Sequence, residues 1–429
     1  MNELLTKGIG HTEFKDSPVG KIPVEWEVKE LVQVGRCIRG LTYSPDNVVE
    51  NGLLVLRSSN VQDGRLLFED NVYVDLKVGD EYLSKNGDIL ICVRNGSRRL
   101  LGKSATITSN CPKSTHGAFM TVFRGELNFY VKHLMKSEMF FRQVSIDIGA
   151  TINSINNSNL LQFRFAFPPL PEQQKIASIL TSVDEVIEKT QSQINKLQDM
   201  KKGTMNELLT KGIGHTEFKD SPVGKIPKEW EVKKFGEIAR VQGGYAFKSK
   251  DAQESGARWL KIANVGIGKV VWKDKSHLPP EFLTEHRDFV LRTGDIIVAL
   301  TRPILNHKLK IAMVDTPDSG ALLNQRVGRI LSKTDVGVRF LYYLLKSEYS
   351  VGFIEKVIFG SDPPNISGQQ IESINFAIPS IQEQQKIASI LSSMDSHIEE
   401  KQRKLQQTQS LKKSLMQDLL TGKVRVTVN

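Results

Sequence analysis

Three short motifs have residue types that could do chemistry, and each lacks a part of the site it would need. Asp362-Pro363-Pro364-Asn365 resembles the D-P-P-aromatic motif of amino-group methyltransferases, whose ring stacks on a flipped base, but Asn365 has no ring. The E-x-K triplet at 27–29, repeated at 231–233, lacks the metal-binding aspartate of a nuclease. Gly224-Lys225 lacks the flanking residues of a phosphate loop. The sequence therefore predicts no catalytic site.

The cysteines and histidines indicate no metal site. Cys37, Cys92 and Cys111 show no C-x-x-C spacing, so we expect reduced thiols rather than zinc ligands or disulfides. The eight histidines are scattered along the chain. No apolar run approaches the roughly 18 residues of a membrane span, and the N-terminus has no apolar signal region. We expect a cytoplasmic protein with no membrane association.

The positive charge of the chain is unevenly distributed. The net charge is +10 and the isoelectric point is about 9.3, a balance typical of proteins that bind polyanions. Residues 89–125 carry six Lys or Arg and no Asp or Glu, whereas residues 172–202 carry five basic and five acidic side chains. A DNA-binding surface is therefore expected outside the segment 172–202.

Two basic loops occupy the same position in a duplicated framework. Aligning Lys103 with Lys310 sets RNGSRRLLG, residues 94–102, against TRPILNHKL, residues 301–309. Both offer donors for base edges and phosphates. The predicted DNA-binding residues are Arg94, Asn95, Ser97, Arg98 and Arg99 in the first loop and Thr301, Arg302, Asn306, His307 and Lys308 in the second. Two similar domains would then recognise two different DNA sequences; the alternative is solvated loops that contact only phosphates.

A second pair of matching loops supplies further candidates. Tyr43 and Ser44 match Phe247 and Lys248 in loops that follow a glycine, and we predict that these residues also contact DNA. Asn60 and Asn264 match as well. Identical residues at matching positions indicate a shared domain framework rather than two specificities.

The framework is an internal repeat that covers the chain. Residues 1–30 recur at 205–234 with two changes, Val24 to Lys228 and Glu30 to Lys234. Later landmarks match at offsets that grow from 204 to 211, so the second half gains seven residues in small insertions, which loops tolerate. The near-identity of the first segments suggests either exchange of domains by DNA recombination or equal constraint on the protein sequence.

Two long periodic segments, 172–209 and 383–420, both open with EQQKIASIL. Apolar residues three and four apart form a heptad seam in each, interrupted by polar residues such as Thr190 and Lys401. A helix of some 38 residues would be roughly 57 Å long, unless a kink at Gly203 shortens the first one. The two helices are expected to pack on each other, the alternative being two separate amphipathic helices in ordinary cores.

The N-terminus repeats the end of a long helix. MNELLTK at 1–7 is identical to 205–211 and resembles MQDLLTG at 416–422. If residues 1–7 lie beside the end of the second helix, a pseudo-two-fold axis relates the two halves. That symmetry requires antiparallel helices.

Each half also has the pattern of a mixed globular domain. Strands are predicted at 53–57, 88–93, 121–123, 259–262, 295–300 and 329–331, and helices at 130–144 and 338–354. The predicted fold class is α+β, with two similar globular domains separated by two long antiparallel helices that form a coiled coil in a pseudo-two-fold, circular repeat. The predicted bounds are 1–171 and 211–382 for the domains, with 172–210 and 383–429 for the helices and the C-terminal tail.

The chain resembles the specificity subunit of type I restriction-modification systems over essentially its whole length. The resemblance is carried by the P-L-P-E-Q-Q-K-I-A-S-I-L helix entry at 169–180, its partner at 379–391, the G-D-I turns at Gly87 and Gly294, and the C-V-R-N-G-S loop at 92–97. The second helix entry departs from the first, with Ser and Gln in place of two prolines.

This resemblance implies a non-catalytic chain that recognises a bipartite double-stranded DNA site, one half per target-recognition domain. It implies two modification subunits, which carry S-adenosylmethionine and methylate the 6-amino group of adenine, and restriction subunits that use ATP and Mg. No cofactor or metal is expected on this chain. The expected subunit-binding residues are Gln173, Gln174, Lys175, Gln384, Gln385 and Lys386. The alternative function is a stand-alone sequence-specific or architectural DNA-binding protein that dimerises through its coiled coil.

Overall fold

The computed structural model describes residues 11, 13–148, 153–272 and 276–427. The chain forms two compact units, of which unit 1 is Met1–Gln191 with Arg403–Asn429 and unit 2 is Ser192–Gln402. The division passes through both long helices, so each unit contains the first part of one helix and the last part of the other. Residues 1–7, for which we predicted a place beside the end of the second helix, lie outside the described residues.

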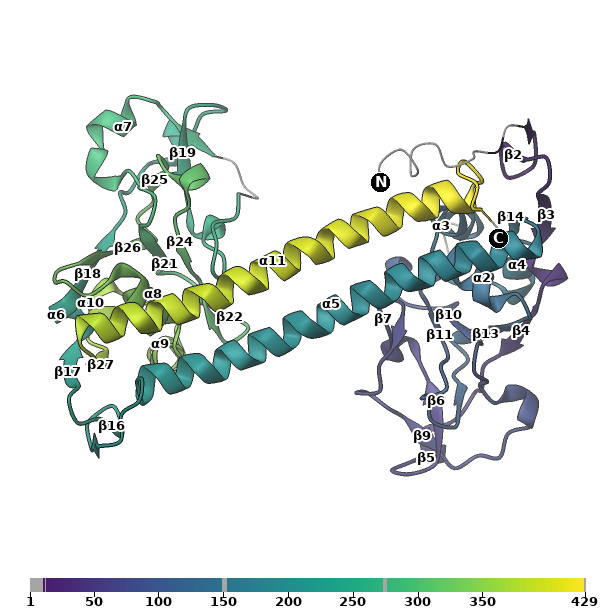
Figure 1. The fold of residues 1–429 in the computed structure, drawn as a ribbon, viewed down its shortest axis with the longest axis horizontal. Coiled ribbons are helices and arrows are strands. Elements are labelled where there is room, and N and C mark those ends of the chain that lie inside the picture. Colours follow the sequence, from purple (N-terminus) through teal and green to yellow (C-terminus); the bar gives the residue numbers. More distant parts are fainter. Residues whose placement is uncertain (1–10, 12, 149–152, 273–275, 428–429) are drawn as a thin grey trace. The chain divides into compact units, whose positions relative to one another are not determined.

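The two long helices are α5 (Leu170–Thr210) and α11 (Ile381–Leu420) (Figure 1). Each begins two residues before its predicted start, and α5 continues through Gly203. Every predicted seam position is buried or half-buried, including the polar ones: these are Ile176, Leu180, Val183, Ile187, Thr190, Ile194, Leu197, Lys201 and Leu208 in α5, with Ile387, Leu391, Met394, Ile398, Lys401, Leu405, Thr408, Leu415 and Leu419 in α11. The heptad pattern therefore identified the packed face of each helix.

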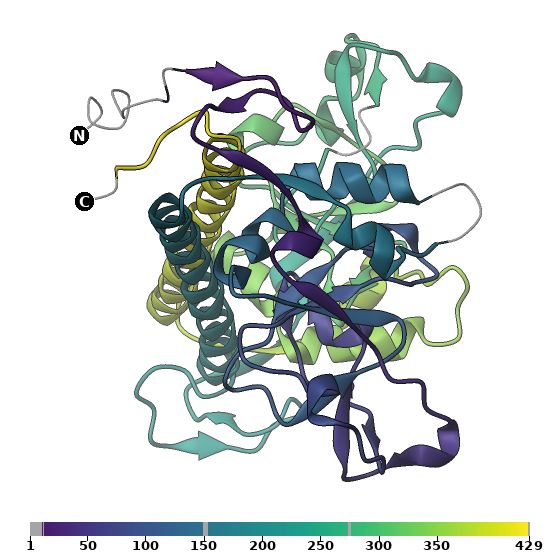
Figure 2. The same cartoon turned by 90° about the vertical axis from the view of Figure 1, so that its right-hand side faces the viewer.

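Within each unit the two long-helix segments lie side by side, as Figure 2 shows, and their contacts give their relative direction. In unit 2, Lys401 Nζ donates to Gln193 Oε1 at 3.0 Å, and Lys201 forms an ion pair with Asp395. In unit 1, Lys412 forms an ion pair with Asp184. Higher numbers on one helix thus meet lower numbers on the other, which confirms the predicted antiparallel coiled coil.

The described residues of unit 1 form two four-stranded sheets and three strand pairs. The first sheet has the order β11-β10-β13-β4 and is antiparallel; the second has the order β12-β6-β9-β5, in which β12 and β6 are parallel. The strand bounds are β1 Phe14–Lys15, β2 Ile22–Pro23, β3 Glu27–Glu30, β4 Arg36–Arg39, β5 Val48–Val49, β6 Leu53–Leu56, β7 Val61–Gln62, β8 Arg65–Leu66, β9 Tyr73–Val74, β10 Ile89–Cys92, β11 Ser104–Thr106, β12 Ser114–His116, β13 Met120–Arg124 and β14 Arg164–Phe167.

Unit 2 repeats this plan. Its sheet β18-β26-β21-β24 matches β4-β13-β10-β11, and its sheet β20-β19-β25 again has one parallel pair, β19 with β25. The strand bounds are β15 Phe218–Lys219, β16 Ile226–Pro227, β17 Glu231–Lys234, β18 Ala239–Gly243, β19 Ala257–Leu260, β20 His277–Leu278, β21 Ile296–Ala299, β22 Ile304–Leu305, β23 Lys308–Leu309, β24 Ile311–Met313, β25 Leu322–Leu323, β26 Val327–Ser332 and β27 Asn375–Ile378. All six predicted strands are present, which confirms the α+β class.

The short helices correct one prediction. The single helices predicted at 130–144 and 338–354 are two helices each, because Ser137 and Ser347 adopt extended backbone and their hydroxyls cap the second helix of each pair. The bounds are α2 Asn128–Leu134, α3 Glu138–Asp147 and α4 Asn157–Leu161 in unit 1, with α6 Phe235–Ile238, α7 Phe282–Glu285, α8 Val338–Lys346, α9 Glu348–Ile358 and α10 Gly368–Glu372 in unit 2.

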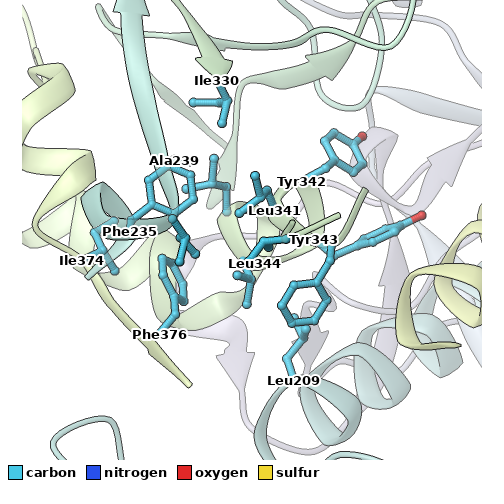
Figure 3. Packing of buried hydrophobic residues seen from close by; sticks show 14 of the residues in the cluster. Leu209, Phe235, Ala239, Ile330, Leu341, Tyr342, Tyr343, Leu344, Ile374 and Phe376 are labelled. Carbon is cyan, nitrogen blue, oxygen red and sulfur yellow. The ribbon is translucent and has the colours of Figure 1, made fainter. Parts of the chain in front are cut away.

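A hydrophobic core joins each pair of long-helix segments to its own unit. In unit 2, Leu209 of α5 packs in one cluster with Leu344 and Phe376 (Figure 3). In unit 1, Leu419 of α11 shares a cluster with Trp26. The long helices are therefore part of both cores, which explains how the globular parts fix their ends.

Candidate DNA interface

The two predicted loops leave and rejoin the same strand positions in the two units. In unit 1, Cys92 N–H donates to Lys103 O at 2.9 Å, and in unit 2 Ala299 N–H donates to Lys310 O at the same distance. A neighbouring segment also forms the same backbone hydrogen bond next to each loop. Ile155 N–H donates to Val93 O and Ile366 N–H donates to Leu300 O, both at 2.8 Å. These two backbone bonds at the base of each loop are thus duplicated in the two units.

Two buried asparagines hold this framework. Asn60 and Asn264 are 1% and 0% exposed, and their side-chain oxygens accept from Arg57 N–H and Lys261 N–H at 2.9 Å. Their side-chain amides donate to carbonyls seven residues further on. Because these bonds are internal, the two asparagines are structural, in agreement with the shared-framework interpretation of their identity.

The first loop, residues 94–102, is a compact turn. Asn95 Nδ2 donates to Ser58 Oγ at 3.0 Å, and Asn95 Oδ1 accepts from Ser97 N–H at 2.9 Å, so Asn95 holds the turn. Arg98 Nη2 donates to Ile148 O at 3.1 Å, whereas Arg99 is exposed. Arg94 is also exposed and lies over the Phe119 ring. Arg94 and Arg99 have the freest guanidinium groups in this loop.

The second loop, residues 301–309, is a β-hairpin. Its strands β22 and β23 pair through Ile304–Leu309 and Leu305–Lys308. The two turn residues, Asn306 and His307, have φ values of 50° and 54°, the geometry of the type I′ turn that matches strand twist. A two-stranded ribbon of this kind fits the DNA major groove.

The donors of this hairpin are exposed except one. Arg302, Asn306, His307 and Lys308 are exposed, whereas Thr301 is 7% exposed and bridges to Asn365. Arg302 N–H donates to Pro364 O at 2.7 Å, which fixes the backbone from which its side chain extends. His307 Nδ1 lies 2.9 Å from Glu355 Oε1. Burial, followed by the charge of Arg302, lowers the pKa of Lys310 at the loop end.

The second pair of candidate loops differs in exposure. Tyr43 is half-buried, and Ser44 is exposed and caps a short turn at Pro45–Asn47. Phe247 is only 7% exposed and stacks on Phe282 at 5.7 Å, while Lys248 is exposed. The more accessible ring of the second loop belongs to Tyr245, which is 42% exposed and which the sequence analysis did not single out.

Two further residues border the loops and were missed. Phe119 O accepts from Val93 N–H and Arg326 O accepts from Leu300 N–H, both at 3.0 Å, so the two residues occupy matching positions. Phe119 is 56% exposed and Arg326 is exposed. Neither lies within the loops that sequence alignment compared, and only the sheet pairing brings them alongside.

The helix entries separate the predicted subunit-binding residues into two groups. Gln173 and Gln384 are buried, and each side-chain amide donates to a proline carbonyl five residues earlier, Pro168 O at 2.8 Å and Pro379 O at 2.9 Å. Gln174, Lys175, Gln385 and Lys386 are exposed. The first glutamine of each entry therefore fixes the chain, and the next two residues are available on the surface.

At the start of each long helix, one buried or half-buried glutamate binds a histidine and a tryptophan, a contact that the sequence patterns did not predict. Glu172 Oε1 and Oε2 meet His11 Nε2 and Trp26 Nε1, each at 3.1 Å. Glu383 makes the matching contacts with His215 at 2.9 Å and with Trp230 at 3.0 Å. The identity of residues 11–26 with 215–230, apart from one exposed position, was the signal that could have revealed this shared anchor.

The described residues show no metal-binding group, disulfide or membrane-spanning helix. No group of three or more His, Cys, Asp or Glu side chains in this part of the chain is arranged to hold a metal ion. Cys37, Cys92 and Cys111 are free, and burial raises the pKa of the Cys37 thiol to about 12. In the described part of the chain, no helix is long and apolar enough to cross a membrane.

Comparison with known proteins identifies related chains. The chain matches the family model described as Type I restriction modification DNA specificity domain twice, at residues 23–199 and 227–409. The MjaVIII specificity subunit of Methanocaldococcus jannaschii is 33% identical over 419 residues, covering 96% of each chain. The EcoKI specificity subunit of Escherichia coli is 26% identical over 298 residues, covering 65% of this chain and 62% of the relative.

Solved structures share the fold. The S subunit of a type I restriction-modification system from M. genitalium superposes with a TM-score of 0.59 at 16% identity, covering 92% of this chain and 96% of that one. A chain from a study of complex assembly and conformational transition of the type I R-M system gives a TM-score of 0.52 at 13% identity, covering 94% and 99%. At these identities the likeness concerns the fold alone.

Proposed function

Because the chain belongs to the type I restriction modification DNA specificity family, we propose that it recognises a bipartite DNA site, one half per unit. The observation that carries this proposal is the duplicated framework with two different loops. The same backbone bonds hold residues 94–102 as a turn in unit 1 and residues 301–309 as a hairpin in unit 2. One scaffold presenting two surfaces suits two different half-sites.

The DNA contacts are assigned to the exposed donors of the loops. Arg94, Arg99, Arg302 and Lys308 can bind guanine edges or phosphates, and Asn306 can bind adenine. Asn95 and Arg98 act through loop conformation, since both are engaged by neighbouring protein atoms. The remaining candidates are Tyr43, Ser44, Ser97, Phe247, Lys248, Thr301 and His307, of which Phe247 and Thr301 are buried and act on the surface only through their neighbours.

We assign the domains according to these DNA-binding and spacing roles. Residues 1–171 and 211–382 are the target-recognition domains, and 172–210 with 383–429 are the spacer helices and C-terminal tail. The length of α5, 41 residues or roughly 61 Å, sets the separation of the two half-sites. This length exceeds one DNA turn of about 34 Å. We therefore assign the base pairs between the two half-sites to a spacer that the protein does not contact.

The modification and restriction subunits supply the methylation and cleavage activities. Two modification subunits bind the helix entries through Gln174, Lys175, Gln385 and Lys386, with Gln173 and Gln384 positioning these residues. Specificity subunits are non-catalytic, and S-adenosylmethionine, ATP and Mg act on the modification and restriction subunits. We place no cofactor on this chain, and we place the complex in the cytoplasm, where its DNA lies.

Mapping methylated adenines in cells that express this chain with its modification subunits tests the proposal. We expect one bipartite motif, with Arg94→Ala relaxing or abolishing the requirement in one half and Arg302→Ala in the other. Arg142→Ala, which changes an exposed arginine of α3 that belongs to neither loop, is the matched control. Methylation that is unchanged in both loop variants would refute the assignment.

The rival function, a stand-alone DNA-binding protein, makes a different prediction. It requires tight, sequence-specific binding by the purified chain alone. Gel-shift titrations over a salt series, with and without modification subunits, separate the two, because phosphate contacts alone give strong salt dependence without sequence preference. Specific binding only in the assembled complex supports the subunit function.

A further inference from the structure

Phe359 is an apolar side chain that the fold of unit 2 leaves in solvent. It directly follows α9, which ends at Ile358, and its side chain is 90% exposed. The free energy that burial of a phenylalanine contributes is therefore not gained within the chain. A contact outside the chain would gain it.

The repeat provides an internal comparison for this position. Counted from the capping serines Ser137 and Ser347, Ile148 matches Ile358, and both pack toward their units. The glycine that follows is Gly149 in the first half and Gly360 in the second, one residue later. Phe359 is therefore the added residue, so the shared framework does not require it.

The surroundings of Phe359 are those of the second recognition loop. Glu355, one helical turn earlier on α9, contacts His307 of the hairpin at 2.9 Å. The segment after Phe359 reaches Pro364, whose carbonyl accepts from Arg302 N–H at 2.7 Å. Leu305 of the hairpin is itself 52% exposed. The exposed Phe359 ring thus follows, by one helical turn, a residue that contacts the hairpin, and precedes by five residues one that bonds to Arg302.

We infer that Phe359 is an apolar wedge that enters the base stack at the edge of the half-site bound by unit 2. This inference rests on the proposed function and adds a contact to it. Apolar side chains that insert between base steps unstack them and bend the duplex, and a base stacked on an aromatic ring gives binding energy without hydrogen bonds. The hairpin donors would fix the register while the phenyl ring deforms the neighbouring step.

The test uses the complete chain assembled with its modification subunits and duplexes that carry 2-aminopurine at successive steps of the mapped half-site. We expect binding to raise 2-aminopurine fluorescence at one step, Phe359→Ala to abolish that rise and weaken binding about 10-fold, and Phe359→Trp to retain both. Tyr349→Ala is the matched control, since Tyr349 is 46% exposed near the start of the same helix.

The outcomes separate the inference from the function it rests on. If Phe359→Ala leaves the fluorescence rise or the affinity unchanged while Arg302→Ala weakens specific binding, the wedge is wrong and the proposed function stands. If Arg302→Ala and Phe359→Ala both bind like the unaltered complex, the loop assignment itself fails. Because Phe359 is exposed, the variants are expected to fold, which circular dichroism checks.

Discussion

The Trp26 indole N–H donates to the Glu172 carboxylate at 3.1 Å across 146 residues of sequence. Both side chains are buried, and Glu172 lies in the first turn of α5, where the helix dipole favours negative charge. The bond ties the segment before β3 to the start of the long helix. Trp230 and Glu383 repeat it at 3.0 Å.

Replacing Glu172 by alanine should loosen this anchor. The buried Trp26 N–H would lose its partner, which costs about 1–3 kcal/mol of unfolding free energy. Hydrogen exchange followed by mass spectrometry should show faster exchange at residues 22–30 and at the start of α5. Glu185→Ala, an exposed position on the same helix, is the control and should change nothing. Equal exchange in both variants would contradict an anchoring role.

Unit 1 should lose stability in mild acid because of His133. His133 is 1% exposed, and burial first, then nearby lysines, lowers its pKa to about 2. Below the ordinary histidine pKa of about 6.5 the unfolded chain binds a proton that the folded chain excludes, so stability falls as pH drops. The loss from this group approaches 1.4 kcal/mol per pH unit.

A substitution taken from the other unit tests this acid dependence. Tyr343 stands at the position that matches His133, so His133→Tyr should reduce the loss of unfolding free energy between pH 7.5 and 5.5, measured by urea denaturation. His397→Gln, which alters an exposed histidine on α11, should leave the loss as it is. A pH dependence that is identical in wild type and His133→Tyr would show that His133 takes up its proton in the folded chain.

The Asp395 carboxylate should contribute more to the unfolding free energy than the lysine that pairs with it. Asp395 forms an ion pair with Lys201 and accepts from Tyr343 Oη at 2.8 Å, and its charge also acts on the buried Lys346. Burial lowers the pKa of both lysines. Asp395→Asn removes the ion-pair partner of the half-buried Lys201 and leaves Glu399 as the carboxylate that acts on Lys346, whereas Lys201→Met leaves Asp395 with Lys346.

We expect unfolding free energy to fall by about 2 kcal/mol for Asp395→Asn and by about 1 kcal/mol for Lys201→Met, values reduced for partial exposure of the carboxylate. Chemical denaturation measures both, with Glu400→Gln on the same helix as the control. A larger effect for Lys201→Met would reverse this order and argue that Lys346 does not sense Asp395.

Deleting one heptad, Thr190–Lys196, should change the DNA spacer or prevent assembly. The deletion keeps the seam in register and shortens α5 by about 10 Å, close to three base pairs of DNA. Methylation mapping of the variant measures the spacer directly. A permuted control that keeps the length and the apolar seam should preserve the original site. Unchanged methylation by the shortened chain would exclude helix length as the determinant.

Sequence periodicity predicted the helices and the repeat well because both depend on local spacing. The seam positions and the six strands follow from the spacing of apolar residues, because the buried face of a helix or strand requires that spacing. The breaks at Ser137 and Ser347 were missed because a serine within an amphipathic pattern can either continue a helix or cap a new one. Only packing decides between these states.

The candidate interface was harder to predict because exposure depends on tertiary contacts. Phe247 and Tyr245 are two residues apart in one aromatic-rich loop, and nothing local indicates which ring is buried. Likewise, Phe119 borders the first loop only because β13 pairs with β10. The anchors at Glu172 and Glu383 connect residues far apart in sequence, beyond the reach of any spacing pattern.

The duplicated framework also has a practical consequence for protein engineering. Residues 94–102 and 301–309 are equal in length and attach through the same backbone bonds, Cys92 to Lys103 and Ala299 to Lys310. The two segments can therefore be treated as cassettes whose exposed positions vary independently of the cores. A library that randomises only those positions, such as Arg99 in the first cassette and Lys308 in the second, would vary their chemistry while Leu101 and Leu309 stay in the cores.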